Sequence, residues 1–334
     1  AIIKIRSNLL GAVASTPKAP AGRALHSASM WLNLAPEMHD DQLPIDADIA
    51  RSMIRDQFPH YAGAPVVQLA ASGTTNAIFR VGREVAARFP LRAAEPEACL
   101  ATLHREAEAM AAFARHSPFA APLPLGIGAP GPRYPLPWSL QSWLDGDVAT
   151  PDGLCASDVF ARDIASLIAH LRRADTGGRR FSGEGRGGHL PDHDAWMETC
   201  FDRSGDLLDV PRLRALWSRL RALPRAGPDC MTHGDLIPAN LVVRDENLAG
   251  VLDTGGFAPA DPALDLVAAW HLFDRPRRGT IRTLLEAGDI QWKRGAAWAF
   301  QQAMGLVWYY RLSNPAMATL GRSTLSRLLD DPEI

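Results

Sequence analysis

Apolar residues recur at two spacings along this chain, and the change of spacing separates a strand-containing first part from a helical second part. Short apolar runs divided by turns predict strands at residues 66–69, 77–81 and 85–89. Apolar positions three and four residues apart predict a helix before these strands, at 46–58, and another after them, around 100–111. Residues 135–146 predict the last strand of this part and its connection to the next.

From Ser157 onward the apolar spacing is that of helices. Helices are predicted at 157–175, 192–201, 211–223, 266–273, 280–287, 292–311 and 315–329. One segment departs from this spacing, because residues 241–243 and 248–252 are apolar and the four residues between them are polar. That pattern predicts a β-hairpin within the helical part.

Polar residues stand at both ends of the predicted hairpin. The segment His233-Gly234-Asp235-Leu236-Ile237-Pro238-Ala239-Asn240 leads into the first strand, and Asp253 follows the second. The hairpin therefore brings Asn240 and Asp253 to the same end. Two oxygen ligands suit magnesium, which takes few protein ligands and completes its shell with water and phosphate oxygens.

An Asp, an Asn five residues later and a second Asp after an apolar strand are the working parts of kinase-type phosphoryl transfer. In that chemistry one Asp accepts the proton of the substrate hydroxyl, and the Asn and the second Asp hold magnesium. Taken singly, each of these residues is as well explained as a turn or capping residue. The ordered set, followed by Asp261-Pro262-Ala263-Leu264-Asp265-Leu266, favours the catalytic interpretation.

Composition places the chain among soluble globular proteins. Apolar residues make up 47% and charged residues 22%, and 334 residues are enough for two lobes around a cleft. The net charge of -2 gives no reason to expect nucleic acid or an anionic membrane as partner. No apolar stretch approaches the roughly 20 residues that span a bilayer. The scattered cysteines (Cys99, Cys155, Cys200 and Cys230) indicate reduced thiols in a cytoplasmic protein.

Residues 1–37 differ from the rest, since they carry basic residues, Ala, Ser and Pro but no acid until Glu37. A targeting segment has this composition. We favour an extension outside the working domain, which we expect to begin near Met38.

The motifs HGDLIPAN (233–240), LDTGG (252–256) and ADPALDL (260–266) resemble those of the aminoglycoside phosphotransferase family, small-molecule kinases that share the protein-kinase fold. The resemblance covers nearly the whole working domain. It implies Asp235 as catalytic base and Asn240 and Asp253 as metal ligands. It also implies that Asp265, together with His233, supports the catalytic loop.

The same resemblance implies an α+β, protein-kinase-like fold of two lobes. Residues 38–143 would form a small nucleotide-binding lobe with an antiparallel sheet, and residues 144–334 a larger, mostly helical lobe for catalysis and substrate binding. Two positions depart from the family pattern: Thr254 replaces the usual aromatic residue and Ala260 the usual Gly. Neither departure removes a metal-binding atom.

Three segments of the first part would bind the nucleotide by this resemblance. The turn Ser72-Gly73-Thr74-Thr75 would lay backbone N–H groups over the phosphates. Arg88 stands where many relatives have Lys, and a guanidinium can hold phosphate oxygens with two parallel bonds. Glu106, with Glu108 as the alternative, would pair with Arg88.

The third segment is the connection between the lobes, where backbone groups would meet the nucleobase edge. It comprises Gln141, Ser142, Trp143 and Leu144. We expect Trp138 and Trp143 to be core residues and not stacking partners for the base.

These features together predict a Mg²⁺-dependent transfer of the γ-phosphoryl group of ATP or GTP to a hydroxyl of a small molecule, with an aminoglycoside or another antibiotic as one candidate class. An acidic pocket would suit polycationic aminoglycosides, and five acids could line one, although such acids are more often a solvated face. They are Asp192, Asp194, Glu198, Asp202 and Asp206. Macrolides, hydroxylated amino acids, choline-like alcohols and sugars stay open as acceptors.

Two other classes of protein share parts of this pattern. A pseudokinase would bind nucleotide without turnover, and the replacements at Arg88 and Thr254 are its support. An aspartic protease would use the two Asp-Thr-Gly triplets, at 175–177 and 253–255. Asp175, however, follows a charged helical run, and the chain is largely helical, which disfavours the protease.

Overall fold

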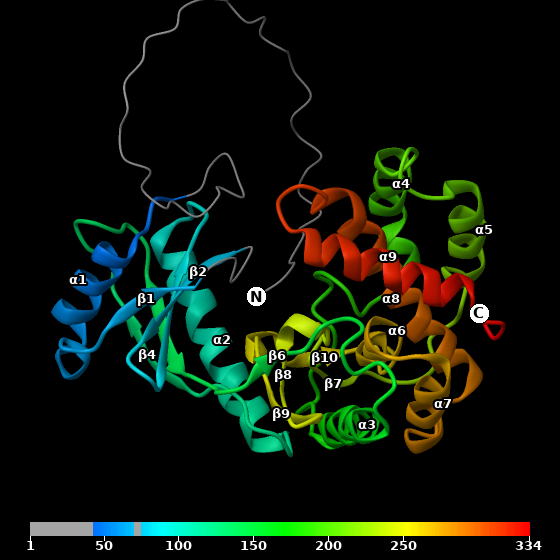
Figure 1. The fold of residues 1–334 in the computed structure, drawn as a ribbon, viewed down its shortest axis with the longest axis horizontal. Helices are drawn as coiled ribbons and strands as arrows, with labels where there is room; N and C mark the ends of the chain where they lie inside the picture. Colours follow the sequence, from blue (N-terminus) through cyan, green and yellow to red (C-terminus); the bar gives the residue numbers. More distant parts are fainter. Residues whose placement is uncertain (1–42, 70–74) are drawn as a thin grey trace, which may run out of the picture.

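The computed structural model describes residues 43–69 and 75–334, which form two lobes. A five-stranded antiparallel sheet with two helices makes up the N-terminal lobe, and helices make up most of the C-terminal lobe (Figure 1). The predicted α+β, protein-kinase-like class is therefore confirmed. It rules out the all-β architecture of a pepsin-like protease.

The N-terminal sheet has the strand order β1-β2-β3-β5-β4, and every neighbouring pair is antiparallel. Its elements are α1 (Ala47–Gln57), β1 (Val66–Gln68), β2 (Asn76–Val81), β3 (Val85–Pro90), α2 (Pro96–His116), β4 (Pro124–Gly128) and β5 (Trp138–Ser142). The predicted strands and both predicted helices are present within a few residues of their expected bounds.

The alternation of side chains along β3 separates the core of this lobe from its functional face. Val85, Ala87 and Phe89 pack into the core with α1 and with Trp138, on which Phe89 stacks at 4.6 Å. Arg88 points to the opposite sheet face, where α2 lies, because successive strand residues alternate sides. Trp138 is a core residue as expected, whereas Trp143 is half-buried, under the guanidinium of Arg80.

Strand β4 was not predicted from the sequence. Its residues include Pro124, Gly126 and Gly128, which disfavour strands, and it lies at the sheet edge where such residues are tolerated. The strand forms by pairing with β5, with a register shift between Pro124 and Gly126. Pairing with the next strand along the chain therefore overrides local preference here.

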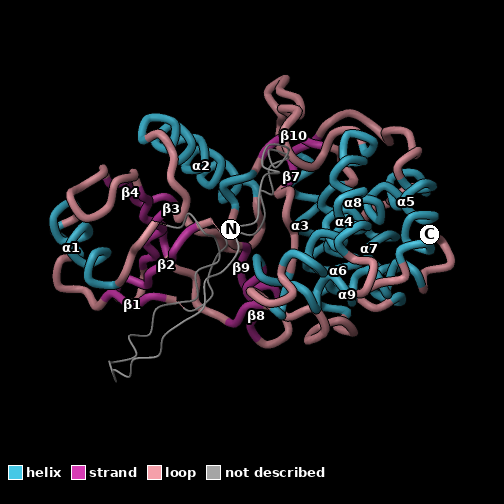
Figure 2. Tube along the Cα trace, turned by 90° about the horizontal axis from the view of Figure 1, so that it is seen from above, coloured by secondary structure: helices cyan, strands magenta, loops and turns pink. Residues whose placement is uncertain are grey.

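Five short strands lie between the N-terminal sheet and the helices of the other lobe (Figure 2). They are β6 (Asp147–Val148), β7 (Cys230–Thr232), β8 (Leu241–Arg244), β9 (Asn247–Val251) and β10 (Ala258–Ala260). Strands β8 and β9 form the predicted hairpin, with Leu241 opposite Val251. The loops after β7 and β9 hold the catalytic motif.

The helices of the C-terminal lobe confirm the predicted helical spacing. They are α3 (Asp158–Arg173), α4 (Asp194–Arg203), α5 (Val210–Leu220), α6 (Val267–Leu272), α7 (Arg275–Leu284), α8 (Asp289–Tyr309) and α9 (Pro315–Leu329). Helix α7 begins five residues before its predicted start at 280, because Asp274 caps it and Pro276 suits its first turn. Helix α8 is buried along most of its length and packs against α4, α5, α6 and α9. No helix in the described part of the chain is long and apolar enough to cross a membrane.

A buried ion pair anchors α8 to the segment between β10 and α6. Arg294 donates through Nε and Nη2 to Oδ2 of Asp261, at 2.8 and 2.5 Å, and Trp298 Nε1 donates to the same oxygen. Asp261 Oδ1 accepts from the backbone N–H of Ala263. Both charged side chains are almost fully buried, at 0% and 2% exposure. Removing either partner would leave the other charge buried without a counter-ion.

We therefore expect Asp261→Ala to lower the free energy of unfolding by about 3–5 kcal/mol, measured by urea denaturation. The control is Asp202→Ala, which removes an exposed carboxylate 3.7 Å from Arg214 and should change stability by less than about 1 kcal/mol. Equal losses in the two variants would contradict the structural role of the buried pair.

Candidate active site

The loop between β7 and β8, which carries the candidate catalytic residue Asp235, is held by the carboxylate of Asp265. The backbone N–H groups of His233 and Gly234 donate to its two oxygens, at 2.9 and 2.8 Å. Gly234 has a φ of +81°, which lets the chain turn here without strain. Burial raises the pKa of Asp265, while the hydrogen bonds from the two backbone N–H groups act in the opposite direction.

His233 connects the loop to the end of β9. Its Nδ1 accepts from the backbone N–H of Asp235 at 3.2 Å, and its Nε2 lies 2.9 Å from the carbonyl oxygen of Leu252. Because the backbone N–H can only donate, the imidazole is neutral with its proton on Nε2. The ring thus links the loop that carries Asp235 to the residue directly before Asp253.

The Asp235 carboxylate receives hydrogen bonds from side chains of three separate segments. Oδ1 accepts from Arg186 Nη2 and from Gln302 Nε2, both at 2.7 Å. Oδ2 accepts from Asn240 Nδ2 at 3.1 Å, and the same Nδ2 lies 2.9 Å from the Asp235 carbonyl oxygen. The side chains of Arg186 and Asp235 are 12% and 14% exposed. The carboxylate is therefore oriented from several sides and yet accessible.

Asn240 and Asp253 meet at the end of the hairpin. The backbone N–H of Leu252 donates to the carbonyl oxygen of Asn240 at 2.8 Å, which sets Asp253 beside Asn240. Asp253 has a φ of +55°, in the left-handed region, and this turns the chain away from β9. Because Asn240 Nδ2 serves Asp235, Oδ1 is the amide atom that remains for a cation.

The donor set of Asn240 and Asp253 fits magnesium better than a transition metal. Among the described residues no group of three or more His, Cys, Asp or Glu side chains is arranged to hold a metal ion. An amide oxygen and a carboxylate are hard ligands, and magnesium accepts one or two of them when phosphate and water complete its shell.

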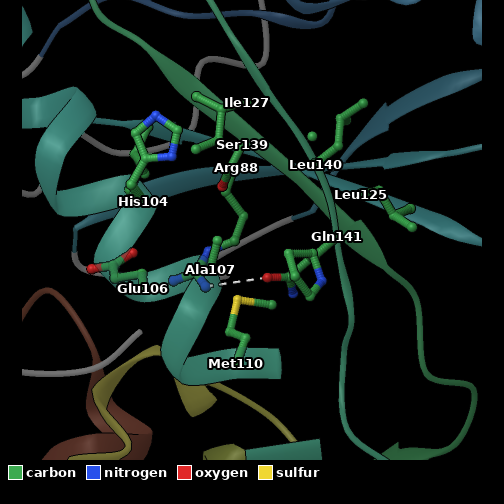
Figure 3. A pocket seen from close by; sticks show the side chains of 13 residues that line it. Arg88, His104, Glu106, Ala107, Met110, Leu125, Ile127, Ser139, Leu140 and Gln141 are labelled. Carbon is green, nitrogen blue, oxygen red and sulfur yellow. Dashed lines mark hydrogen bonds between the residues drawn. The ribbon is translucent and has the colours of Figure 1, made fainter. Parts of the chain in front are cut away.

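Arg88 joins the nucleotide side of the site to Asp253. Its Nη2 donates to Asp253 Oδ1 at 3.2 Å and its Nη1 to Gln141 Oε1 at 3.3 Å. Arg88, Glu106 and Gln141 line a cavity of about 450 Å³ between α2, β4 and β5 (Figure 3). Arg88 is 7% exposed, and the Asp253 carboxylate compensates its charge.

The expected pairing of Arg88 with Glu106 is wrong for this structure. Arg88 donates to Asp253 and Gln141 instead, and in Figure 3 the Glu106 carboxylate points away from the guanidinium. Glu106 packs against the turn after Asp253: a Cβ added to Gly255 would lie 3.1 Å from the Glu106 Cβ. This close approach explains the glycine and ties α2 to the catalytic segment.

The other residues expected to bind nucleotide are Gln141 to Leu144 and the turn at 72–75. Ser142 and Trp143 donate their backbone N–H groups to the carbonyl oxygens of Leu123 and Glu84, at 2.9 and 2.7 Å. These two N–H groups are therefore used within the protein and do not face a base, which corrects part of the expectation for 141–144. Thr75 accepts from the backbone N–H of Leu91 through its carbonyl oxygen. Ser72, Gly73 and Thr74 lie outside the described residues.

A family model described as the phosphotransferase enzyme family matches residues 66–299, which is more than half of the chain. The chain belongs to this phosphotransferase family. A search of curated protein sequences returned no match.

Solved structures of phosphotransferases share the fold of this family member at low sequence identity. The GDP and kanamycin complex of APH(2")-IIia has a TM-score of 0.63 and 18% identity, covering 84% of this chain and 97% of that one. The macrolide 2'-phosphotransferase MphH from Brachybacterium faecium has a TM-score of 0.54 and 19% identity, covering 84% and 98%. The gentamicin complex of APH(2")-IIa has a TM-score of 0.57 and 15% identity, covering 87% and 98%.

Two residues that contact Asp235 were given no role in the site from the sequence. Arg186 lies in a segment with several glycines of positive φ, including Gly185 and Gly187, and that segment reaches Asp235 only in the folded chain. Gln302 is one of two adjacent glutamines in the buried and mostly apolar second half of helix α8. That exception to the apolar pattern is the one signal that could have identified it.

For the catalytic loop we expect Asp265→Asn to lower the free energy of unfolding by about 1–3 kcal/mol, because the amide NH₂ group would face a backbone N–H in place of an acceptor. The amide protons of His233 and Gly234 should then exchange faster in hydrogen-exchange experiments. The exposed Asp206→Asn variant should change neither property. Unchanged exchange in Asp265→Asn would show that the loop is held by other contacts.

Proposed function

We propose that this phosphotransferase moves the γ-phosphoryl group of ATP or GTP to a hydroxyl of a small molecule. The observation that carries the proposal is the Asp235 carboxylate, oriented by Arg186, Asn240 and Gln302 and placed beside the pair Asn240 and Asp253. The buried Asp265 carboxylate holds the loop that carries Asp235 and Asn240.

In this proposal Asp235 orients the acceptor hydroxyl and takes its proton as the new P–O bond forms. Asn240 Oδ1 and the Asp253 carboxylate would hold Mg²⁺, which neutralises charge on the phosphates when it is bound. Arg88 would then engage phosphate oxygens, because it is a cation beside Asp253 on the nucleotide side. Such catalysis depends on positioning and electrostatics, and the rigid surroundings of Asp235 suit both.

The comparisons support a nucleotide donor and a hydroxyl acceptor of antibiotic type without deciding either. One structural neighbour is described with GDP and kanamycin, another with gentamicin, and a third is a macrolide phosphotransferase. At these identities the likeness concerns the fold. These compounds are therefore the first members of a test panel and not assigned substrates.

The acids that could have attracted a polycation are largely engaged elsewhere. On α4, Asp194 pairs with Arg221 of α5 and accepts from Trp217 Nε1, and Glu198 and Asp202 face Arg214. Their charges are compensated by the neighbouring helix, which weakens the basis for an aminoglycoside in particular. Acceptors without several positive charges belong on the panel equally.

The direct test is mass spectrometry of an acceptor panel (aminoglycosides, macrolides, sugars and amino alcohols) incubated with the protein, Mg²⁺ and either ATP or GTP. We expect a gain of one phosphoryl group on one compound. The gain should disappear in Asp253→Ala, which removes a metal ligand, and persist in Asp330→Ala, which removes an exposed carboxylate on the C-terminal helix end.

Retention of full activity by Asp253→Ala would contradict the assignment of this residue. A wild-type protein that binds nucleotide and modifies no compound would favour the alternative of a nucleotide-binding pseudokinase. A protein that binds neither nucleotide would refute the proposed function altogether.

A further inference from the structure

A chain of three buried polar side chains leads from Asp235 into the helical core of the C-terminal lobe. Gln302, on α8, places Nε2 2.7 Å from Asp235 Oδ1 and Oε1 3.1 Å from His271 Nε2. His271, on α6, places Nδ1 2.8 Å from Oγ1 of Thr324, on α9. His271 and Thr324 have no exposed surface, and Gln302 is 5% exposed.

The Asp235 carboxylate at one end of this series sets the direction of each hydrogen bond between the side chains. An ionised carboxylate can only accept, so Gln302 must present its NH₂ group to Asp235. The amide oxygen then faces His271, which must carry its proton on Nε2. His271 Nδ1 is therefore an acceptor, and the Thr324 hydroxyl donates to it. Burial lowers the pKa of His271 to about 3, so the ring keeps this neutral form at ordinary pH.

We propose that Gln302, oriented by His271 and Thr324, is a positioning residue that turns the Asp235 carboxylate so that one free acceptor site on Oδ2 faces the substrate hydroxyl. This inference rests on the proposed function, since it concerns how the same base is held. Gln302 acts through Asp235 and is not itself required to touch substrate.

The free site follows from counting the hydrogen bonds of the carboxylate. An ionised carboxylate offers about four lone-pair sites, two on each oxygen. Arg186 and Gln302 occupy both sites of Oδ1, and Asn240 occupies one site of Oδ2. Oδ2 is therefore the oxygen with room for a further O–H donor, and proton transfer from the acceptor hydroxyl goes to this atom.

A purely structural role would not require this arrangement. Buried polar side chains favour one packed arrangement only when each of them has a hydrogen-bond partner in one orientation. Here the series of hydrogen bonds ends at Asp235, the candidate base. Without His271 the Gln302 amide oxygen loses the donor that holds it in place. The Nε2 group would then no longer be fixed at one position against Asp235 Oδ1, and the carboxylate would lose part of its orientation.

The neighbouring Gln301 provides a matched control on the same helix. Its Nε2 lies 3.2 Å from His193 Nδ1, and it makes no hydrogen bond to Asp235 in the described part of the chain. Gln301→Leu removes a buried amide of the same size as that of Gln302 and leaves the hydrogen bonds of Gln302, His271 and Thr324 in place.

The first arm of the test is NMR of the full chain, which needs no turnover. In ¹⁵N-histidine-labelled protein, with the signals assigned by their loss in His271→Gln, we expect His271 to be neutral and protonated on Nε2 between pH 5 and 8. The Gln302 side-chain amide signal, assigned by its loss in Gln302→Leu, should shift in Asp235→Asn and in His271→Leu. It should stay in place in Gln301→Leu.

The second arm measures hydrolysis of ATP or GTP with Mg²⁺, in which water replaces the hydroxyl acceptor. His271→Leu and Gln302→Leu should lower kcat by about 10- to 100-fold, the effect of one hydrogen bond to a charged group, with the nucleotide KM unchanged. His271→Gln should restore most of kcat, because its amide can donate to Gln302 as the imidazole does. Gln301→Leu should retain the wild-type rate.

A His271 ring that is charged or protonated on Nδ1, or a Gln302 signal insensitive to Asp235→Asn, would overturn the proposal. So would a wild-type kcat in His271→Leu, or a loss that His271→Gln does not restore. A wild-type protein that hydrolyses no nucleotide and modifies no compound of the acceptor panel would count against the proposed function, whereas the first arm would still report on the hydrogen bonds of Gln302 and His271. The two failures are therefore distinguishable.

Discussion

The site depends on one constraint: the Asp235 carboxylate is oriented by donors from three places far apart in the sequence. Arg186 comes from the segment after α3, Asn240 from the catalytic loop itself, and Gln302 from the middle of α8. Each donor is held by its own surroundings, and the Asp261–Arg294 pair fixes α8 relative to the catalytic segment. The packing of the helical lobe thus helps to hold the Asp235 carboxylate in one orientation.

A second connection runs between the lobes through Arg88 and Asp253. The Arg88 guanidinium lies on the strand that faces α2, and it reaches the carboxylate at the end of the hairpin. Helix α2 packs against the turn that follows Asp253, where a Cβ at position 255 would lie 3.1 Å from the Glu106 Cβ. A movement of the N-terminal lobe would therefore alter the contact between Arg88 and Asp253, the expected metal ligand. Binding of nucleotide phosphates by Arg88 would act on the same contact.

Local pattern predicted those parts of the site that are continuous in sequence. The hairpin with Asn240 and Asp253 at one end followed from two short apolar runs and a polar turn. Gln302 and Arg186 could not be placed in this way, because their positions depend on the packing of α8 and on a glycine-rich segment. The expected Arg88–Glu106 pair was wrong for the same reason, since residue types show that a pair is feasible but not which acid lies nearer. Strand β4 formed against its local preference.

The most direct test of the central claim is a comparison of binding and turnover in Asp235→Asn, which keeps the shape of the side chain and removes its capacity to take a proton. The wild-type protein and the variant should bind Mg²⁺ and nucleotide with dissociation constants within about twofold, since the proposed contacts to nucleotide and metal lie at Arg88, Asn240 and Asp253. Phosphoryl transfer should fall by at least about 100-fold in the variant. Turnover close to the wild-type rate would contradict the role of Asp235 as the base.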